Sequence, residues 1–424
     1  MKAVIVHGVR TPFAKAGTDL KRLSAIELGK IAVRELLARS GVPGDDVDQL
    51  VYGTVVHDPT AGNIAREVGL ATLPKTVPAS TVSRACITGN QAICDAANLI
   101  EVGTAEIVIA GGAESLSHIP IMVSDKLSDI LVSASKAKTL GERVTTFGRV
   151  RPRDLIPRTP QIAEPTTGET MGEATERMAK ENGIARADQD EWALRSHRLA
   201  AAATEDGRLT AEIAPCYTGR HYEKLVDRDN GVRADSTLEK LATLKPVFDR
   251  RYGSLTAGNS SPLTDGASAV MMMTEERARA LGLEPLGRVR GYAFTALDPA
   301  GQLLAGPAYA APIALDRAGV TMQDIGLMEM HEAFAAQVLS NLQQLGSKEF
   351  AEEELGRARA VGHPPIEKIN VMGGSIAIGH PFAATGARVT TTLLNEMKRR
   401  DVELGLVTVC AAGGMGFAMV LERV

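Results

Sequence analysis

Short apolar runs alternate with longer stretches in which apolar residues recur every three or four positions, and this alternation extends over most of the chain. The first eight residues form an apolar run that predicts a buried strand. Residues 32–56 predict a helix, a Ser-Gly-Val-Pro break and then a strand. Residues 310–330 repeat this plan with an Ala-Gly-Val-Thr break. The two ends of the chain therefore echo each other.

A second pair of segments repeats in the same way. Residues 88–115 predict a helix, a strand and a Gly-Gly turn, and residues 385–416 predict the same order. Each series then ends in one more apolar strand, at 267–273 and at 416–421. Because helices that alternate with strands form parallel βαβ units, two such series predict a duplicated α/β fold.

Two stretches interrupt this repeat. Residues 120–250 are rich in loops and prolines and contain a long helical pattern at 172–206, so we expect an inserted subdomain. A smaller, charged insertion covers residues 347–368. The predicted units are listed in chain order: a first half made of 1–119 and 251–283, an inserted loop and substrate-binding domain at 120–250, and a second half at 284–424.

Composition narrows the class of protein. The chain has 424 residues, of which 44% are hydrophobic and 23% charged, which suits two or three compact units of a soluble protein. A net charge of −4 and an aromatic content of 4% argue against nucleic-acid binding. The first residues lack the apolar core of a signal peptide, and no window approaches the roughly 20 apolar residues that span a bilayer. We therefore expect a cytoplasmic protein.

The cysteines give no sign of a metal site or a disulfide framework. Cys86, Cys94, Cys216 and Cys410 form no Cys-x-x-Cys pair, and no His-x-x-x-His lies near them, which argues against zinc. Four cysteines in so long a chain are typical of reduced thiols. Cys94 falls on the same predicted helix as Cys86 and is expected to pack in the core, and no role is assigned to Cys216.

Cys86 is the first candidate for chemistry. It stands in Ser83-Arg-Ala-Cys86-Ile-Thr-Gly, where small and polar residues precede a helical run. At a helix N-terminus, the dipole and free N–H groups would lower the pKa of the thiol and stabilise a nucleophilic thiolate. The alternative is an inert, buried cysteine.

His380 follows the Gly-rich run that starts at Gly373 and precedes Pro381, which we expect at the first helical position. A histidine held rigidly in this way can accept a thiol proton or donate to an oxyanion, although it could also serve only as a cap. Cys410 ends a predicted strand beside a Gly-rich turn, whose N–H groups can form an oxyanion hole or a plain turn. His331 opens the run His-Glu-Ala-Phe and could donate to a thioester oxygen. As a zinc motif that run fails, because no second histidine follows at the required spacing.

Together and in this order, these motifs resemble the thiolase family. The resemblance covers essentially the whole chain, including the segments at 170–172 and 256–267. The His-Glu-Ala-Phe and Gly-His-Pro-Phe runs, and the insertion before the second, are similar to the thiolase subunit of the trifunctional complexes of fatty-acid β-oxidation. Many thiolases carry Asn where His331 stands.

The resemblance implies an α/β fold with two βαβαβαββ halves in five layers, α-β-α-β-α, and the inserted loop domain. It implies a 3-ketoacyl-CoA thiolase in which Cys86 attacks the 3-keto carbon, His380 accepts the thiol proton and Cys410 protonates the released enolate. His331 and His380 would donate hydrogen bonds to the thioester oxygen. The N–H groups of Cys86 and Ala412 would stabilise the tetrahedral intermediate. The family usually has Gly where Ala412 stands, so this role requires a local conformation that suits Ala.

The resemblance also implies ligands and partners. Coenzyme A and acyl-CoA would be substrates, with no permanently bound cofactor and no metal. Positions that contact the pantetheine arm in the family correspond to Met171, Ala257 and Ser261. The expected assembly is a homodimer or larger, with a hydratase and dehydrogenase α subunit as a candidate partner.

Three other functions compete with this one. A biosynthetic acetyl-CoA acetyltransferase uses the same chemistry to form acetoacetyl-CoA. A decarboxylating ketosynthase pairs its cysteine with two histidines, and Cys410 argues against it. A non-catalytic scaffold subunit of a lipid-enzyme complex would have no need of the four reactive side chains.

The segment at 119–160 is locally basic within an acidic chain. Leu127, Ile130, Leu131 and Ala134 fall at helical spacing and predict an apolar stripe. Such a helix could dock on a partner subunit, lie on an anionic membrane, cover CoA phosphates or pack on its own core. The hypothesis is docking to an α subunit, with peripheral membrane contact as a further option. The cations of the segment are Lys126, Lys136, Lys138, Arg143, Arg149, Arg151, Arg153 and Arg158.

Overall fold

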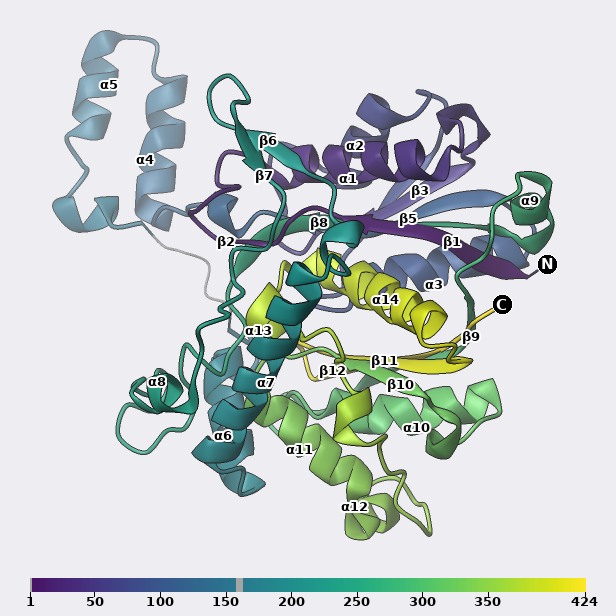
Figure 1. Ribbon diagram of the computed structural model, residues 1–424. Helices are drawn as coiled ribbons and strands as arrows, with labels where there is room; N and C mark the ends of the chain where they lie inside the picture. Colours follow the sequence, from purple (N-terminus) through teal and green to yellow (C-terminus); the bar gives the residue numbers. More distant parts are fainter. Residues whose placement is uncertain (1, 158–162) are drawn as a thin grey trace.

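The protein is built of five layers, which Figure 1 shows nearly edge-on. The computed structural model describes residues 2–157 and 163–424. Helices cover the outer face of each of two sheets, and two helices lie between the sheets. The outer helices of the first half are α1 (Ala25–Ser40) and α2 (Ile64–Thr72), the central pair is α3 (Thr88–Glu101) and α14 (Phe382–Arg399), and the outer helices of the second half are α10 (Gly306–Ala318) and α11 (Ala335–Gly346).

The two sheets repeat one strand order. The first sheet runs β4-β3-β5-β8-β1, with β2 added to β8, and the second runs β10-β11-β12-β9. In both, the early strands are parallel and the last two pairings are antiparallel. The strands of the first sheet are β1 (Ala3–Arg10), β2 (Ala14–Lys15), β3 (Gln49–Gly53), β4 (Ala79–Val82), β5 (Ile107–Glu114) and β8 (Thr264–Thr274), and those of the second are β9 (Arg288–Ala296), β10 (Leu327–Met330), β11 (Leu404–Ala411) and β12 (Met415–Glu422).

Where the second sheet should carry a counterpart of β4, it has a single parallel bridge between Met328 and Ile369. The next residue, Asn370, pairs with the strand through its side chain, which accepts from the N–H of Met330 and donates to its carbonyl at 2.8 Å each. One amide side chain thus replaces the missing strand. The duplicated α/β fold predicted from the repeat is confirmed.

The central helices are packed so closely that glycine is required where they cross. A Cβ atom on Gly89 of α3 would lie 2.7 Å from the carbonyl oxygen of Ala383 and 3.0 Å from the amide of Ala387, both on α14. Nearly every residue of α14 is buried, because both sheets pack against it. This crossing lies just beyond Cys86 and His380, so it sets how closely those residues approach.

A long excursion connects β5 to β8, and the predicted unit at 120–250 falls within it. The helical pattern at 172–206 forms two helices rather than one, because the chain turns at Asn182 and at Gly183, where φ is +64°. The elements of the excursion are α4 (Asp125–Lys136), α5 (Leu140–Phe147), α6 (Met171–Glu181), α7 (Arg186–Glu205), β6 (Cys216–Thr218), β7 (Lys224–Val226) and α8 (Leu238–Ala242). Beyond it lies α9 (Glu275–Ala280), and the smaller insertion begins with α12 (Lys348–Glu353).

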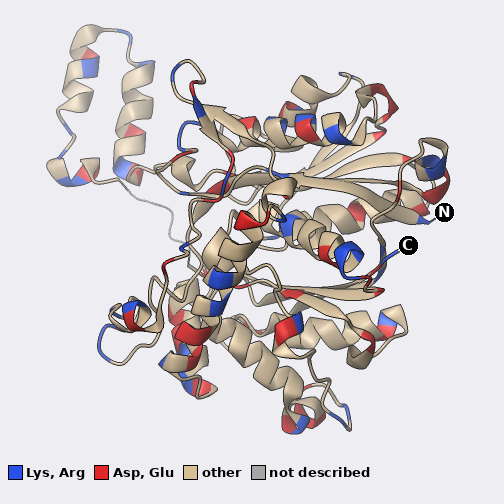
Figure 2. Ribbon diagram, in the orientation of Figure 1, with Lys and Arg blue, Asp and Glu red and all other residues tan. Residues whose placement is uncertain are grey.

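Helices α4 and α5 form a hairpin that projects from the body of the molecule (Figure 1). Of the predicted apolar stripe, Leu127, Ile130 and Ala134 are buried, whereas Leu131 is 43% exposed. The hairpin contains both basic and acidic residues (Figure 2), and Lys126 pairs with Asp154 at 2.6 Å. The last cation of the basic segment, Arg158, lies outside the described residues. Within the described ranges, no helix is long and apolar enough to cross a membrane.

Candidate active site

The four predicted catalytic side chains form two close pairs, His331 with His380 and Cys86 with Cys410. Cys86 follows β4, His331 follows β10, Cys410 lies in β11 and His380 directly precedes the α14 cap. The rings of His331 and His380 are 4.1 Å apart at their centres. The N–H groups of Ala412 and Cys86 lie close enough to the Cys86 sulfur to lower the pKa of its thiol, and Cys86 is close enough to Cys410 to raise the pKa of that thiol. The Cys86–Cys410 pair therefore joins residues from both halves of the chain.

A tight turn holds Cys86 in front of α3. The residue before it, Ala85, has φ of +44°, a conformation that non-glycine residues rarely adopt. The Thr88 hydroxyl stabilises this turn, since it accepts from the N–H of Arg84 at 2.8 Å and donates to the carbonyl of Ala85 at 2.7 Å. The turn presents the sulfur toward the other half of the molecule.

The expectation of a lowered pKa for Cys86 is wrong. Burial raises the pKa of this thiol to about 12, and the N–H groups of Ala412 and Cys86 oppose the rise only in part. The helix begins at Thr88, two residues beyond Cys86, so the sulfur lies outside its first turn. The nucleophile is thus a neutral thiol at rest, and its proton has to move to a base as it attacks.

Both histidines are buried and present Nε2 without a partner. His331 Nδ1 lies 3.0 Å from Ser375 Oγ, and His380 Nδ1 lies 2.6 Å from Thr385 Oγ1. Both Nε2 atoms are buried and lack a hydrogen-bond partner among the described residues. Burial lowers the pKa of His380 to about 3 and that of His331 well below its ordinary value. Pro381 was predicted as the first helical residue, but it is the N-cap of α14, and the helix begins one residue later at Phe382.

Glu332 anchors the segment that carries His331. Its two carboxylate oxygens accept from the side chains of Trp192, Ser196 and Asn370 at 2.7–3.0 Å and from the N–H of Ile376 at 3.2 Å. Trp192 and Ser196 belong to α7 of the inserted region. A buried carboxylate is stable only when its oxygens are satisfied, so the insertion supports the catalytic segment directly.

A second buried carboxylate, Glu114 at the end of β5, lies close enough to Cys86 to raise the pKa of its thiol. It accepts from the N–H groups of Val55 and Val56 at 3.1 and 2.9 Å, and from that of Ala383 in the first turn of α14 at 3.3 Å. Burial raises the pKa of Glu114 to about 7. It ties the loop after β3 to the helix that follows His380.

The turn after β11 places Ala412 beside Cys86. Among the described residues, positive φ outside glycine is confined to Ala85, Tyr222, Asn370 and Asp401, so Ala412 has an ordinary conformation and its N–H is available without strain. The N–H of Gly413 donates to Glu164 at 2.8 Å, which fixes the turn. Cys410 packs in a small apolar cluster against which Met171 also lies.

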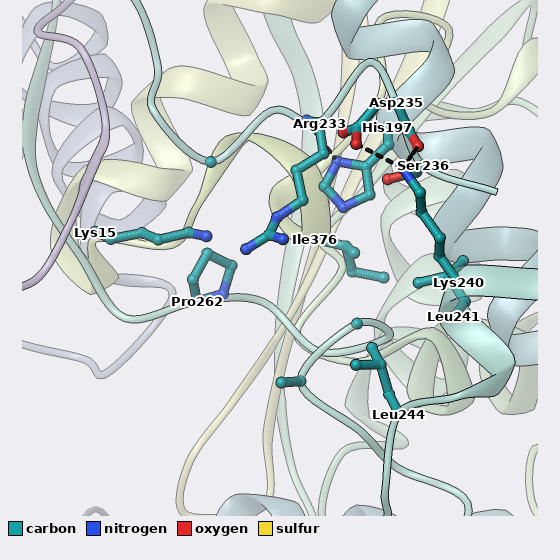
Figure 3. Close-up of a pocket in the computed structure, with 13 residues that line it drawn as sticks. Lys15, His197, Arg233, Asp235, Ser236, Lys240, Leu241, Leu244, Pro262 and Ile376 are labelled. Atoms are coloured by element: carbon teal, nitrogen blue, oxygen red, sulfur yellow. Dashed lines mark hydrogen bonds and ion pairs between the residues drawn. The ribbon is translucent and has the colours of Figure 1, made fainter.

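A cavity of about 200 Å³ is lined in part by Ile376, the residue after Ser375 (Figure 3). Lys15 and Arg233 point toward each other across it, and no ion pair joins either to a carboxylate within the described part of the chain. Two facing cations suit an anionic ligand, although Asp235, which pairs with Lys240, also lines the cavity. Ala257 also lines the cavity. Ser261 lies nearby in sequence, and its N–H donates to the carbonyl of Ala333 at 2.9 Å, two residues after His331.

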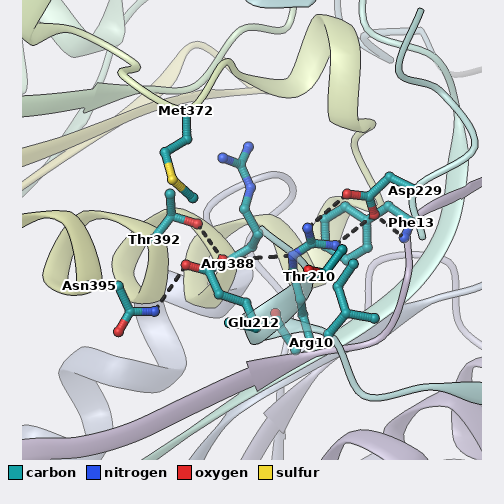
Figure 4. A network of polar contacts seen from close by, with 12 residues as sticks. Arg10, Phe13, Thr210, Glu212, Asp229, Met372, Arg388, Thr392 and Asn395 are labelled. Carbon is teal, nitrogen blue, oxygen red and sulfur yellow. Dashed lines mark hydrogen bonds and ion pairs between the residues drawn. The ribbon is translucent and has the colours of Figure 1, made fainter. Parts of the chain in front are cut away.

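A buried network holds the wall that carries Arg233 (Figure 4). Arg10 of β1 forms two hydrogen bonds with Asp229, at 2.7 and 2.8 Å, and Asp229 also accepts from the N–H of Phe13 at 2.7 Å. Glu212, 3.9 Å from Arg10, accepts from Thr392 on α14. The inserted region is thereby fixed to both the first sheet and the central helix.

Sequence reasoning missed several residues around the site. His197 stands in no sequence motif, but it lines the cavity and accepts from the N–H of Arg233 at 3.2 Å. Ser375 and Arg388 were not singled out, although Arg388 donates to Ser375 at 2.8 Å beside His331. A lone arginine within the apolar pattern of α14 was the available signal, because such a charge is buried only with partners. The four cysteines are free, and the described residues contain no cluster that could hold a metal ion.

A thiol, two neutral imidazoles, a second thiol and two converging N–H groups can transfer an acyl group through a covalent intermediate. Comparison with known proteins agrees. Family models for the thiolase N-terminal domain and the thiolase C-terminal domain match residues 3–276 and 283–423. The 3-ketoacyl-CoA thiolases of Yersinia pestis (strain Pestoides F) and Yersinia pseudotuberculosis (serotype O:1b, strain IP 31758) are each 53% identical over 422 residues, covering 99% of this chain and 97% of theirs. The crystal structure of the Bacillus anthracis acetyl-CoA acetyltransferase has a TM-score of 0.84 at 35% identity, covering 100% of this chain and 99% of that one. The chain therefore belongs to the thiolase family.

Proposed function

We propose that this protein is a 3-ketoacyl-CoA thiolase, which cleaves 3-oxoacyl-CoA with coenzyme A to acetyl-CoA and a shortened acyl-CoA in fatty-acid β-oxidation. The proposal is supported by two close pairs of reactive side chains, His331 with His380 and Cys86 with Cys410, and by the N–H of Ala412 beside Cys86. The name shared by relatives that are 53% identical supports the same substrate class.

In the first half-reaction, Cys86 Sγ attacks the 3-keto carbon while His380 Nε2 takes the thiol proton. The N–H groups of Cys86 and Ala412, which lie near the sulfur, hold the oxyanion that forms on the 3-keto oxygen. The carbon–carbon bond then breaks, and its electron pair moves to the acetyl fragment as an enolate. His331 and the protonated His380 donate to the thioester oxygen, and the Cys410 thiol gives its proton to the carbanion.

In the second half-reaction, coenzyme A takes the acyl group from Cys86. The Cys410 thiolate accepts the proton of the CoA thiol while the CoA sulfur attacks the acyl carbon. The N–H groups of Cys86 and Ala412 again hold the oxyanion. Collapse releases acyl-CoA, and Cys86 recovers its proton from His380. Burial and the neighbouring Cys86 raise the pKa of Cys410, which suits a strong base that forms only during turnover.

The CoA moiety binds in the cavity, with Lys15 and Arg233 paired to phosphates and the pantetheine arm passing Ala257, Ser261 and Met171 toward Cys86. CoA acts here as a substrate, and no permanently bound cofactor is required. Reversal of one charge tests the phosphate contact. Arg233→Glu should raise the KM for CoA while leaving acylation of Cys86 by a saturating donor largely intact.

The direct test is CoA-dependent thiolysis over 3-oxoacyl-CoA substrates of increasing chain length, with Cys86→Ala as the inactive control. Cleavage of long and medium chains supports the degradative role. Absence of cleavage at every length, with a folded protein, contradicts the proposal.

The alternative is a biosynthetic acetyl-CoA acetyltransferase, and one observation favours it. The Bacillus anthracis structure named for that activity superposes on the whole chain. A protein that turns over only acetoacetyl-CoA and condenses acetyl-CoA would fit this alternative.

The proposed assembly is a homodimer or larger, located in the cytoplasm. β4 lies at the edge of the first sheet and pairs only with β3 among the described strands, so its outer edge is available to a second copy. Light scattering at micromolar concentration would contradict this if it gave the mass of a monomer.

The α4–α5 hairpin is proposed to dock a hydratase and dehydrogenase α subunit. Leu140, Val144 and Phe147 of α5 are 48–78% exposed, although a projecting hairpin of a monomer would normally present polar side chains. Deletion of residues 125–149 should weaken co-purification with that subunit and leave thiolysis of a short substrate largely intact. Val102→Ser, at an apolar residue 72% exposed elsewhere, is the matched control. If the deletion abolishes vesicle binding but leaves the complex intact, the hairpin binds a membrane instead. If the deletion abolishes thiolysis, the hairpin belongs to the substrate site.

A further inference from the structure

The two catalytic histidines have different hydrogen-bond partners at Nδ1. Ser375 Oγ, which contacts His331, already accepts a hydrogen bond from Arg388 Nη2 at 2.8 Å. A hydroxyl has a single hydrogen to donate. Among the described residues, His331 Nδ1 is the acceptor that this hydrogen can reach. If Nδ1 carried the hydrogen instead, two donors would face one oxygen and the buried hydroxyl hydrogen would stay unpaired, which is unfavourable.

Thr385 gives His380 the opposite arrangement. The Thr385 hydroxyl donates to the carbonyl of Pro381 at 3.2 Å, one turn back in α14. Its oxygen is then free to accept from His380 Nδ1–H at 2.6 Å. With the hydrogen on Nδ1, Nε2 of His380 carries a bare lone pair.

Both rings are neutral near pH 7, so each has a defined tautomer. Burial is the largest cause of the lowered pKa of each ring, and the Arg388 guanidinium lowers both further. Arg388 is itself buried, and it also lies 3.5 Å from Glu329. Its fixed position makes it a constant donor to Ser375.

We propose that Ser375 is a positioning residue that fixes His331 as the Nε2–H tautomer, while Thr385 fixes His380 as the Nδ1–H tautomer. His331 then presents a hydrogen to substrate at all times, whereas His380 presents a lone pair that can take the Cys86 proton. His380 gains its own Nε2–H only by that transfer. The pair of donors around the thioester oxygen is therefore complete only after the nucleophile has been deprotonated, which couples the two events.

This inference rests on the proposed function, but its first test does not. Nitrogen spectra of the protein labelled with ¹⁵N-histidine report which ring nitrogen is protonated, and the His331→Asn and His380→Asn variants assign the two signals. We expect His331 protonated at Nε2 and His380 at Nδ1. The same tautomer on both rings would overturn the proposal even if thiolysis were established.

The second test separates tautomer control from structural damage. Ser375→Ala should shift His331 toward the Nδ1–H tautomer and lower kcat by about 10-fold or more. Ser375→Thr keeps the hydroxyl and should therefore retain most of the wild-type kcat. Ser340→Ala is the matched control, because it removes a buried hydroxyl of α11 that has no hydrogen-bond partner among the described residues. An asparagine amide donates N–H without help, so Ser375→Ala should cost much less in a His331→Asn background. An equal cost in both backgrounds would show that Ser375 acts only on the fold, and would overturn the proposal.

Discussion

Gly89→Ala tests whether the crossing of the two central helices sets the distance between nucleophile and base. The added Cβ would lie 2.7 Å from the carbonyl oxygen of Ala383, whereas ordinary contact begins at 3.4 Å. The helices must therefore separate by about 0.7 Å, since both neighbouring atoms belong to the backbone of α14. Cys86 stands three residues before Gly89 and His380 three before Ala383, so the separation reaches the reacting atoms.

The expected effects differ in size for stability and for rate. Overpacking a core lowers the free energy of unfolding by about 1–3 kcal/mol, and the higher helix propensity of Ala raises it by about 1 kcal/mol. We therefore expect a net loss of about 1–2 kcal/mol in the free energy of unfolding. A misplacement of about 1 Å at the reacting atoms can cost roughly 100-fold in rate, so kcat should fall by about 10- to 100-fold.

The assay is thiolysis at saturating CoA, together with the thermal unfolding midpoint at a fixed scan rate. Gly346→Ala is the matched control, because a Cβ there meets nothing within 4 Å. It should leave kcat unchanged and the midpoint unchanged or slightly higher. A folded Gly89→Ala protein with the wild-type kcat would refute the claim that this crossing sets the catalytic geometry.

Three further predictions concern the reacting groups. Cys86→Ala should abolish turnover in a folded protein, and mass spectrometry after incubation with acyl-CoA should find the adduct on Cys86; an adduct on Cys410 would reverse the assigned roles. Cys410→Ser should still form the acyl-enzyme but fail at the carbon–carbon step, because the pKa of a hydroxyl is too high for the shuttle, and equal loss of both half-reactions would contradict a dedicated acid–base role. The folded pKa of His380, about 3, lies below its ordinary 6.5, so the unfolded chain binds the extra proton first and stability should fall as the pH drops from 7 toward 3. The thermal midpoint of His380→Asn should fall less over that range, and an equal fall would place the acid sensitivity elsewhere.

The fold could be predicted from the sequence because its main signals are periodic. The repeated helix–break–strand series predicted both halves, and the family comparisons and the structure confirm that fold. The division into units at 119, 250 and 283 remains a prediction. The break at Asn182–Gly183 was missed, because the apolar pattern continues across it and one glycine is compatible with a helix.

The site was predictable only where a motif surrounds the reactive atom. Cys86, His331, His380 and Cys410 each stand in a Gly-rich or strand-end context, and the structure brings His331 to His380 and Cys86 to Cys410, while their roles remain predictions. The raised pKa of Cys86 could not be foreseen, because burial depends on packing by distant segments. Ser375 has no local signal either, since its importance arises from contacts with His331 and Arg388 across the fold.

The hydrogen bonds from Trp192 and Ser196 to Glu332 also constrain how the protein is made. The donors precede the carboxylate by 140 and 136 residues. At a synthesis rate of about 5–20 residues per second, α7 would wait roughly 7–28 s on the ribosome before its partner is translated. During that interval the indole and hydroxyl lie without the carboxylate that they will cover, and the helix has only half of its final surroundings. The nascent first half is therefore a natural client for a chaperone, and catalytic competence arrives only when nearly all of the chain has emerged.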